Sequence, residues 1–160
     1  MIVVSNSTPL IALAKIDCFD LLRELFGAIV VPTAVYDEVV TQAQDRPGAA
    51  QIRQAGWIQT QVPADQTKVD YLRADLDHGE AEVLVLAEQV SANWVLLDEP
   101  KARLAAELLG LKFMGTIGLL LLSKRMGKAE RVRPLLDKLK MNKFHLAERV
   151  YQAAVHPAGE

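Results

Sequence analysis

The chain has 160 residues, 51% of them hydrophobic, and a formal net charge of −2. This length suits one domain with a substantial core, and the hydrophobic fraction excludes an intrinsically disordered chain. The near-neutral balance of charge excludes a whole-molecule attraction to nucleic acid.

Five short segments, several of them continuous apolar runs, predict the strands of a parallel sheet. Such strands read as continuous Val, Ile and Leu because helices cover both faces of the sheet. Pro32 and Pro63 close the second and third runs, since proline cannot extend the hydrogen-bond ladder. The predicted strands are residues 2–5, 29–32, 57–62, 94–97 and 111–114.

Helical patterns fill the segments between these strands, and a turn is expected at 45–48. Leu104 and Leu108 are expected on the inner face of the helix that Gly110 ends. The alternation predicts an α/β fold with about five parallel strands and helices on both faces. The predicted helices are residues 10–14, 18–25, 33–43, 49–55, 65–72, a helix starting just after Gly79, 100–109, 116–122, 129–139 and 145–154.

The domain organisation follows from the same pattern. No internal repeat, low-complexity tract or interdomain linker interrupts it, so one domain is expected over residues 1–160, with a core at 1–125 and basic helices at 126–156. The segment from Lys124 to Arg149 contains nine basic and three acidic residues. Two interpretations of this segment stay open, namely a pair of solvated amphipathic helices or a surface that faces phosphates.

The lone cysteine and the apolar runs bear on location. Cys18 cannot form a disulfide within the chain, and such a composition is typical of the reducing cytoplasm. The longest apolar run falls far short of the roughly 20 residues of a membrane span, and no signal peptide is predicted. We therefore expect a cytoplasmic protein without membrane association.

Polar side chains of the kind that bind metals follow two of the predicted strands. Asn6 follows the first strand and Asp98 the fourth, while Glu38 and Glu80 lie on helices between them. Ligands of parallel sheets collect beyond the carboxyl ends of the strands. Carboxylates placed together there repel one another, so they are tolerated mainly where a cation binds between them. The pattern therefore predicts a divalent-metal site.

Each of these side chains also has a purely structural interpretation. Asp98 could cap the helix that follows it. Glu80 gains roughly 0.3–1 kcal/mol from the dipole of its helix without any metal. Glu38 borders a buried stripe, with Asp37 expected to be the solvated neighbour. Asn6 could hydrogen-bond the turn that follows it.

Other catalytic patterns are missing from the sequence. The three histidines lack the spacing of metal ligands, which argues against zinc. There is no glycine-rich or Gly-Lys-Ser/Thr phosphate loop and no Gly-x-Ser-x-Gly elbow, and Cys18 has no local partner for thiol chemistry. Nucleotide cofactors and covalent hydrolysis are therefore disfavoured.

Taken together, the acidic positions and their flanking residues resemble a PIN-like domain, the fold of toxin ribonucleases from bacterial and archaeal toxin–antitoxin pairs. More narrowly, the chain is similar to an uncharacterised branch of that superfamily. The matching pieces keep the family order and cover about three-quarters of the chain. They are residues 4–11, 31–39, 79–83, 97–99 with Arg103, and 115–120.

The resemblance implies a three-layer PIN-like fold and cleavage of RNA that depends on Mg²⁺ or Mn²⁺. Asn6 takes the position of the acid after the first strand, and Glu38 that of the acid on the helix after strand two. Glu80 matches the acid that opens the central helix, and Asp98 the acid after the fourth strand. These four are the expected catalytic residues, with Asn6, Glu80 and Asp98 as metal ligands.

The resemblance also places supporting residues around the pocket. Thr8, Glu99 and Thr116 are expected to lie behind the ligands and to hold them. Lys101 and Arg103 are expected at the rim, where they would contact RNA phosphates.

The family context implies a toxin that is held by an antitoxin protein and commonly forms a homodimer. The first-strand position is usually Asp in this family, so Asn6 removes one negative charge. Two functions stay open as a result. One is an active metal-dependent endoribonuclease, and the other is a catalytically weak or inactive module that binds RNA or a partner. A receiver-like signalling domain is remote, because it needs an acidic cluster after strand one.

Overall fold

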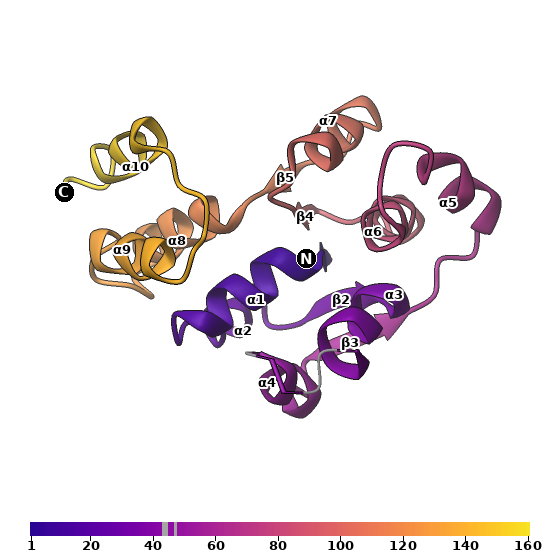
Figure 1. Ribbon diagram of the computed structural model, residues 1–160, viewed down its shortest axis with the longest axis horizontal. Helices are drawn as coiled ribbons and strands as arrows, with labels where there is room; N and C mark the ends of the chain where they lie inside the picture. Colours follow the sequence, from indigo (N-terminus) through magenta and orange to yellow (C-terminus); the bar gives the residue numbers. More distant parts are fainter. Residues whose placement is uncertain (43–44, 47) are drawn as a thin grey trace.

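The computed structural model describes residues 1–42, 45–46 and 48–160. Its centre is a five-stranded, all-parallel sheet with the order β3-β2-β1-β4-β5, which confirms the predicted fold class. The chain winds from β1 outward to β3 and then returns to place β4 beside β1 (Figure 1). The strands are β1 (Val3–Ser5), β2 (Ile29–Pro32), β3 (Ile58–Gln61), β4 (Trp94–Leu96) and β5 (Phe113–Met114).

The central strands form because their side chains are apolar on both faces. Val3, Val4, Val95 and Leu96 are all fully buried, as continuous Val/Leu runs require. The register places Val4 opposite both Val30 and Val95. Strand β5 is shorter than predicted, with two residues paired to β4.

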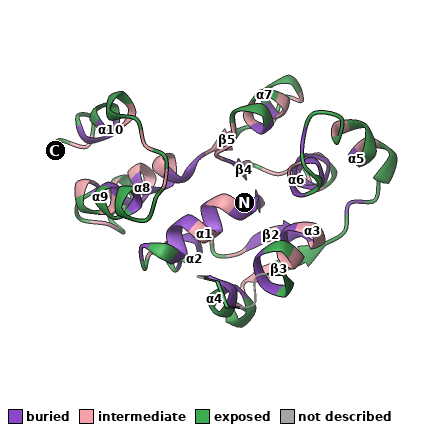
Figure 2. Ribbon diagram, in the orientation of Figure 1, coloured by how far each residue is buried: buried purple, intermediate pink, exposed green. Residues whose placement is uncertain are grey.

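Helices cover both faces of the sheet (Figure 1). One face carries α1 (Ser7–Lys15), α2 (Leu21–Phe26) and α8 (Thr116–Arg125). The other carries α3 (Thr33–Tyr36), α6 (His78–Gln89) and α7 (Pro100–Leu108), and α6 contacts β1, β2 and β4. Figure 2 shows the buried residues on the strands and on the helix faces that meet them.

The remaining helices lie further from the sheet. They are the π-helical segment η1 (Asp37–Thr41), α4 (Ala49–Gln54), α5 (Gln66–Leu72), α9 (Arg133–Met141) and α10 (Glu148–Val155). Helices α9 and α10 pack outside α1 and α8 (Figure 1), and their Leu136, Leu139 and Tyr151 join the same hydrophobic core as the strands. None of the described helices is long and apolar enough to cross a membrane.

Several predicted details differ from the structure. Leu104 and Leu108 are 59% and 80% exposed, so the prediction that they face inward is wrong. Helix α7 instead buries Ala102 and Ala106, since the close contact of α7 with α6 and β5 admits only small side chains there. Thr33 is the first helical residue rather than the cap. Ala43, where that helix was predicted to end, and Pro47 of the predicted turn lie outside the described residues.

Candidate metal-binding active site

The strand order creates a switch point between β1 and β4, because the chain leaves these neighbouring strands in opposite directions. Crevices of this kind, beyond the carboxyl ends of parallel strands, are where α/β folds bind ligands. Asn6 follows β1, and the Asp98–Glu99 pair follows β4. The backbone N–H of Asn6 donates to the carbonyl of Leu96 at 3.0 Å, which fixes the two strand ends side by side.

Asp98 is held firmly by the start of α8. The Thr116 backbone N–H donates to its Oδ1 at 2.9 Å, and the Thr116 hydroxyl donates to its Oδ2 at 2.6 Å. Burial raises the pKa of Asp98, while these two hydrogen bonds and the charge of Arg103 oppose the rise. The alternative role as a helix cap is not observed, since Glu99 occupies the cap position of α7 and no side chain caps it. Thr116 is itself fully buried.

Gly115 makes this close approach possible. A Cβ at Gly115 would lie 1.9 Å from an Arg103 guanidinium nitrogen and 2.7 Å from Asp98 Oδ1. Arg103 is committed to the same corner: its Nε donates to the Leu97 carbonyl at 3.1 Å, and its guanidinium lies 5.8 Å from the centre of the Phe113 ring. Arg103 therefore braces the end of β4, although it was predicted to contact RNA.

Glu99 turns toward α1 rather than away from the site. The Thr8 hydroxyl donates to its Oε1 at 2.5 Å, and the Asn6 Nδ2 donates to its Oε2 at 3.4 Å. Asn6 is only 3% exposed and stands at the cap position of α1, yet its side chain caps no backbone group. The amide of Asn6 is thus directed at a carboxylate and not at the turn.

Glu38 and Glu80 approach from the other side of the crevice. The Ser7 hydroxyl donates to Glu38 Oε1 at 3.4 Å, and a Cβ on Gly79 would lie 3.4 Å from Glu38 Oε2. Glu80 forms a capping box with Asp77: the Asp77 N–H donates to the Glu80 carboxylate at 3.0 Å, and the Glu80 N–H donates to Asp77 Oδ1 at 2.8 Å. Glu80 therefore has both a structural and a site-facing role.

The exposure of Glu38 and Asp37 is the reverse of the prediction. Glu38 is exposed and Asp37 is partly buried. Asp37 Oδ1 accepts a hydrogen bond from Thr41 at 3.4 Å along the π-helical turn. The five-residue spacing of a π turn rotates the following side chains relative to an α-helix, which the 3.6-residue pattern does not anticipate.

Mutual repulsion links the carboxylates. Although the residue as a whole is exposed, partial burial of its carboxyl group raises the pKa of Glu38, and the charges of Asp77 and Glu99 raise it further against the Ser7 hydrogen bond. Burial likewise raises the pKa of Glu80, with contributions from the charges of Asp77, Glu99 and Glu38 that the Asp77 hydrogen bond opposes. The charge of Glu99 contributes to the raised pKa of Glu38, Glu80 and Asp98 alike.

Glu82 belongs to a separate contact. Its buried carboxylate accepts the Ala34 N–H at 3.2 Å at the start of α3 and lies 3.3 Å from His78 Nε2. It thereby satisfies one of the free backbone donors of that helix start. The sequence contained no local signal for this role, because the two helices meet only in the fold.

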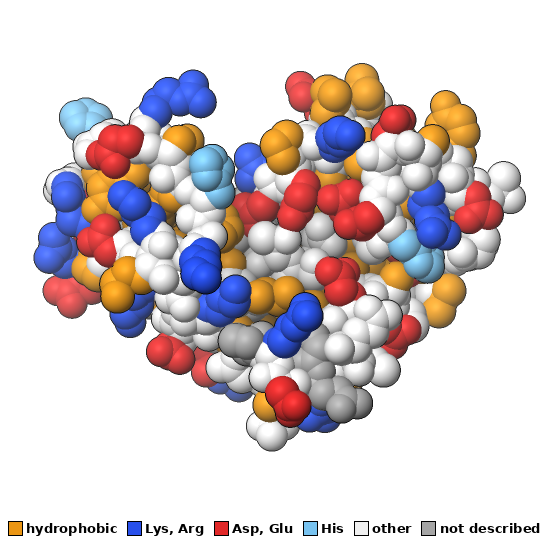
Figure 3. Space-filling view, in the orientation of Figure 1, with side chains coloured by type: hydrophobic (Ala, Val, Ile, Leu, Met, Phe, Trp, Pro, Cys, Tyr) orange, Lys and Arg blue, Asp and Glu red, His pale blue; other side chains and the backbone are white. Residues whose placement is uncertain are grey.

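The surface of the molecule shows the result of these placements. In Figure 3 the face is hollowed between the C-terminal helices and the lobe of α6 and α7. Acidic side chains gather at the centre and on the α6–α7 side, whereas lysines and arginines gather on the opposite wall. The crevice is thus acidic at its floor and basic on one flank.

Comparison with known families identifies the fold. A family model described as a PIN domain matches residues 2–160. The chain belongs to the PIN domain family. A comparison with curated proteins found no match. PIN domains are generally nucleases and typically use divalent metals.

The donor set of the PIN domain crevice suits a hard divalent cation. Carboxylates and amide oxygens are the ligands that Mg²⁺ prefers, and Asn6, Glu80 and Asp98 offer them. Within the described part of the chain, no group of three acidic, histidine or cysteine side chains is already arranged to hold a metal ion. Glu80 is hydrogen-bonded to Asp77 and Asp98 to Thr116, and each carboxylate keeps lone pairs that these hydrogen bonds do not use.

Proposed function

We propose that this PIN domain is an endoribonuclease that hydrolyses RNA phosphodiesters with Mg²⁺ or Mn²⁺. The observation that carries the proposal is the hydrogen bond between Asn6 and Glu99 across the ends of β1 and β4, at the switch point of the sheet. The charge of Glu99 also contributes to the raised pKa of Glu38, Glu80 and Asp98. Burying like charges together is unfavourable unless a cation or proton offsets them. A site that accepts this repulsion is typical of a function rather than of stability.

The residues of the crevice divide the chemistry among them. A bound Mg²⁺ or Mn²⁺ would supply acidified water and neutralise charge on the leaving oxygen. Asn6, Glu80 and Asp98 would hold it. Glu38 is suited to accept a proton from the attacking water, because it is exposed, has a raised pKa and is held only by Ser7 at 3.4 Å.

The surrounding residues keep these groups in place. Thr116 fixes both oxygens of Asp98, and Thr8 fixes Glu99 beside Asn6. Lys101 is exposed in the first turn of α7, where it can approach a flanking phosphate. Arg103 supports the site indirectly, through Asp98 and the Leu97 carbonyl.

The decisive experiment is cleavage of single-stranded RNA with Mn²⁺ by the wild type, Glu80→Gln and Asp98→Asn. We expect each substitution to reduce the rate by at least about 10-fold, as is usual when a metal ligand or its support is altered. Asp70→Asn, on an exposed surface of α5, is the control and keeps the wild-type rate. Equal rates in Glu80→Gln, Asp98→Asn and the wild type would remove these carboxylates from the mechanism.

A second function is favoured by one observation. Asn6 is neutral, and it satisfies Glu99 by a hydrogen bond without any ion. The chain would then be a catalytically weak module that binds RNA or a partner. Titration with Mn²⁺ separates the two functions: the nuclease gains thermal stability at millimolar metal, and the module does not.

The biological setting is part of the proposal. We infer a cytoplasmic toxin of a toxin–antitoxin pair, held by an antitoxin whose basic side chain neutralises the acidic crevice. Tyr71, Leu104 and Leu108 line an exposed hollow between α5 and α7, which suits a homodimer contact. Leu108→Glu, followed by light scattering at increasing concentration, tests it; a mass unchanged from the wild type argues against a dimer through this face.

A further inference from the structure

A second hollow lies beside Glu99, whose carboxylate accepts a hydrogen bond from Thr8 in the lining of this hollow. It is formed by one face of α1 and by the segment that follows α9, and it encloses about 170 Å³. That is below the roughly 300 Å³ of an ordinary small-molecule site, so it suits one flat ring of a longer chain rather than a free cofactor. It is lined by Thr8, Ile11, Ala12, Lys15, Leu139, Asn142, Lys143 and Phe144.

The hollow is continuous with the candidate active site through Thr8. Thr8 lines it and also donates its hydroxyl to Glu99. Thr8, Ile11 and Lys15 lie on one face of α1, since positions i, i+3 and i+7 share a side of a helix. Seven residues at 1.5 Å each place Lys15 about 10 Å along the helix from Thr8. A strand of nucleic acid that enters the acidic crevice can therefore continue along this face.

The chemistry of the lining suits a nucleotide. Phe144 is half-buried and presents an aromatic side chain to the hollow, and Asn142 offers an amide at its edge. Its two lysines, Lys15 and Lys143, are exposed, and neither forms an ion pair with any described residue. Several other C-terminal cations are already engaged, Lys124 and Arg131 with Glu160 and Lys140 with Glu148.

The backbone at Lys143 supplies an independent observation. Helix α9 ends with the Phe144 N–H donating to the Leu139 carbonyl at 3.0 Å and the Lys143 N–H to the Lys140 carbonyl at 3.1 Å. This is the pattern of a Schellman ending, whose left-handed position is usually glycine. Lys143 occupies that position at φ +63°. The lysine at this position therefore carries a backbone cost that glycine would not carry.

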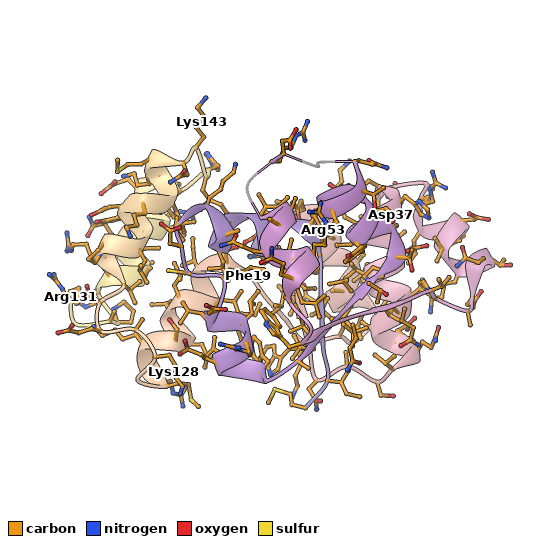
Figure 4. The ribbon with its side chains drawn as sticks, turned by 90° about the horizontal axis from the view of Figure 1, so that it is seen from below. Phe19, Asp37, Arg53, Lys128, Arg131 and Lys143 are labelled. Atoms are coloured by element: carbon orange, nitrogen blue, oxygen red, sulfur yellow. The ribbon has the colours of Figure 1, made fainter. Side chains whose placement is uncertain are left out.

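Lys143 projects from the end of α9. In Figure 4 it lies on the side of the molecule opposite Lys128.

We infer that this hollow, the α1–α9 pocket, is a subsite for single-stranded RNA next to the cleaved bond: Phe144 stacks on a base, and Lys15 and Lys143 bind the adjoining phosphates. The inference rests on the proposed function. Aromatic stacking beside cations is the usual means of holding single strands without sequence preference. The acidic floor needs such cations, because it repels the phosphate backbone on which cleavage acts.

The test is anisotropy of a fluorescent single-stranded RNA of about twelve nucleotides in EDTA, where metal-dependent cleavage cannot occur. Lys143→Gly removes the charge and relaxes the backbone. We expect its melting temperature to equal or exceed the wild type, its affinity at 0.1 M salt to fall about 3- to 5-fold, and its salt slope to lose about 0.7. Lys128→Gln, an exposed cation on the opposite side, is the control with unchanged affinity.

Phe144→Leu tests the base contact separately, since leucine keeps the apolar packing and loses the aromatic face. We expect an affinity loss of about 5- to 100-fold. If both variants bind RNA with wild-type affinity, the proposed subsite is wrong. If only Lys143→Gly binds more weakly, the surface contributes a charge but no base-stacking contact, and the proposed subsite is also wrong. Equal losses in Lys128→Gln would indicate a diffuse surface and overturn it too. Failure of cleavage with Mn²⁺ overturns the proposed function, and binding in EDTA reports on the pocket independently.

Discussion

The side-chain amide of Asn6 donates a hydrogen bond to Glu99 at 3.4 Å. The two residues are 93 positions apart in the sequence, and their contact joins the ends of the neighbouring strands β1 and β4. The amide is neutral, so it can approach the carboxylate of Glu99 without repulsion. An aspartate at the same place would add a second charge to a site that already raises the pKa of Glu38 and Glu80. Glu99 therefore supplies a charge to the end of the first strand, where Asn6 itself has none.

Asn6→Asp tests this relationship. In EDTA we expect a loss of about 1–3 kcal/mol in the free energy of unfolding at neutral pH, because a buried charge gains no partner. With Mn²⁺ the added ligand should raise the melting temperature more than in the wild type. Thermal melts with and without metal measure both effects. Asn93→Asp, at an exposed site that accepts from the Ile2 N–H, is the control. If Asn6→Asp and the wild type are equally stable in EDTA, the side chain at position 6 does not interact with the carboxylates.

Gly115→Ala tests the packing behind Asp98. A methyl group there would overlap the Arg103 guanidinium at 1.9 Å and crowd Asp98 at 2.7 Å. Arg103 can swing aside, but Asp98 then loses its cation, so we expect a loss of about 1–2 kcal/mol by urea unfolding. Gly56→Ala is the control, since nothing lies within 4 Å of its added Cβ. A double-mutant cycle with Arg103→Gln should show coupling between the two positions, and strict additivity would contradict the contact.

The sequence predicted the sheet well because buried parallel strands carry an unmistakable pattern. Val3, Val95 and their neighbours are apolar on both faces, so no other arrangement buries them. The same pattern located Asn6 and Asp98, since each is the first metal-type residue after such a run.

The remaining features depend on contacts that a local pattern does not contain. Asp98 meets Thr116, whereas Glu99 meets Thr8 and Asn6, and which of the two carboxylates meets Asn6 depends on the turn into α7. Leu104 and Leu108 follow a helical period yet face outward, because small residues, Ala102 and Ala106, occupy the tight contact. The α1–α9 pocket could not be foreseen either, since Thr8 and Phe144 are brought together only when α9 packs on α1.

Glu38→Gln tests whether the charge of Glu38 destabilises the fold while it serves RNA cleavage. A carboxyl whose folded pKa is raised weakens the fold when it is ionised; the penalty is absent below the unfolded pKa and complete above the folded pKa. Glu38→Gln should therefore stabilise the protein at pH 7 by less than about 1 kcal/mol, because the group is exposed, and give no gain near pH 4. Its RNA cleavage should fall sharply. Melting temperatures of Glu38→Gln and the wild type, measured against pH, test this expectation. If the variant is still more stable than the wild type near pH 4, the raised pKa of Glu38 is not the cause.

Glu160 anchors the start of α9, and its substitution gives the opposite pH dependence. Its carboxylate, 5% exposed, accepts the Val132 and Arg133 N–H groups at 2.8 and 3.0 Å and pairs with Lys124 at 2.8 Å. These contacts, with the Lys124 hydrogen bond the strongest, lower the pKa of Glu160 to about 2. A lowered folded pKa contributes stability that is complete above the unfolded pKa of about 4.3 and is lost as the pH falls through about 2.

Glu160→Gln should accordingly lower the melting temperature at pH 7, and its difference from the wild type should shrink between about pH 4 and pH 2. Glu148→Gln is the matched control, because the side chain of Glu148 is 70% exposed and lies 3.7 Å from Lys140. It should melt like the wild type, since exposed ion pairs contribute little. Because α9 ends in the segment that forms the α1–α9 pocket, Glu160→Gln should also weaken RNA binding in EDTA as α9 loosens. A destabilised variant that binds RNA normally would show that the pocket does not depend on this anchor.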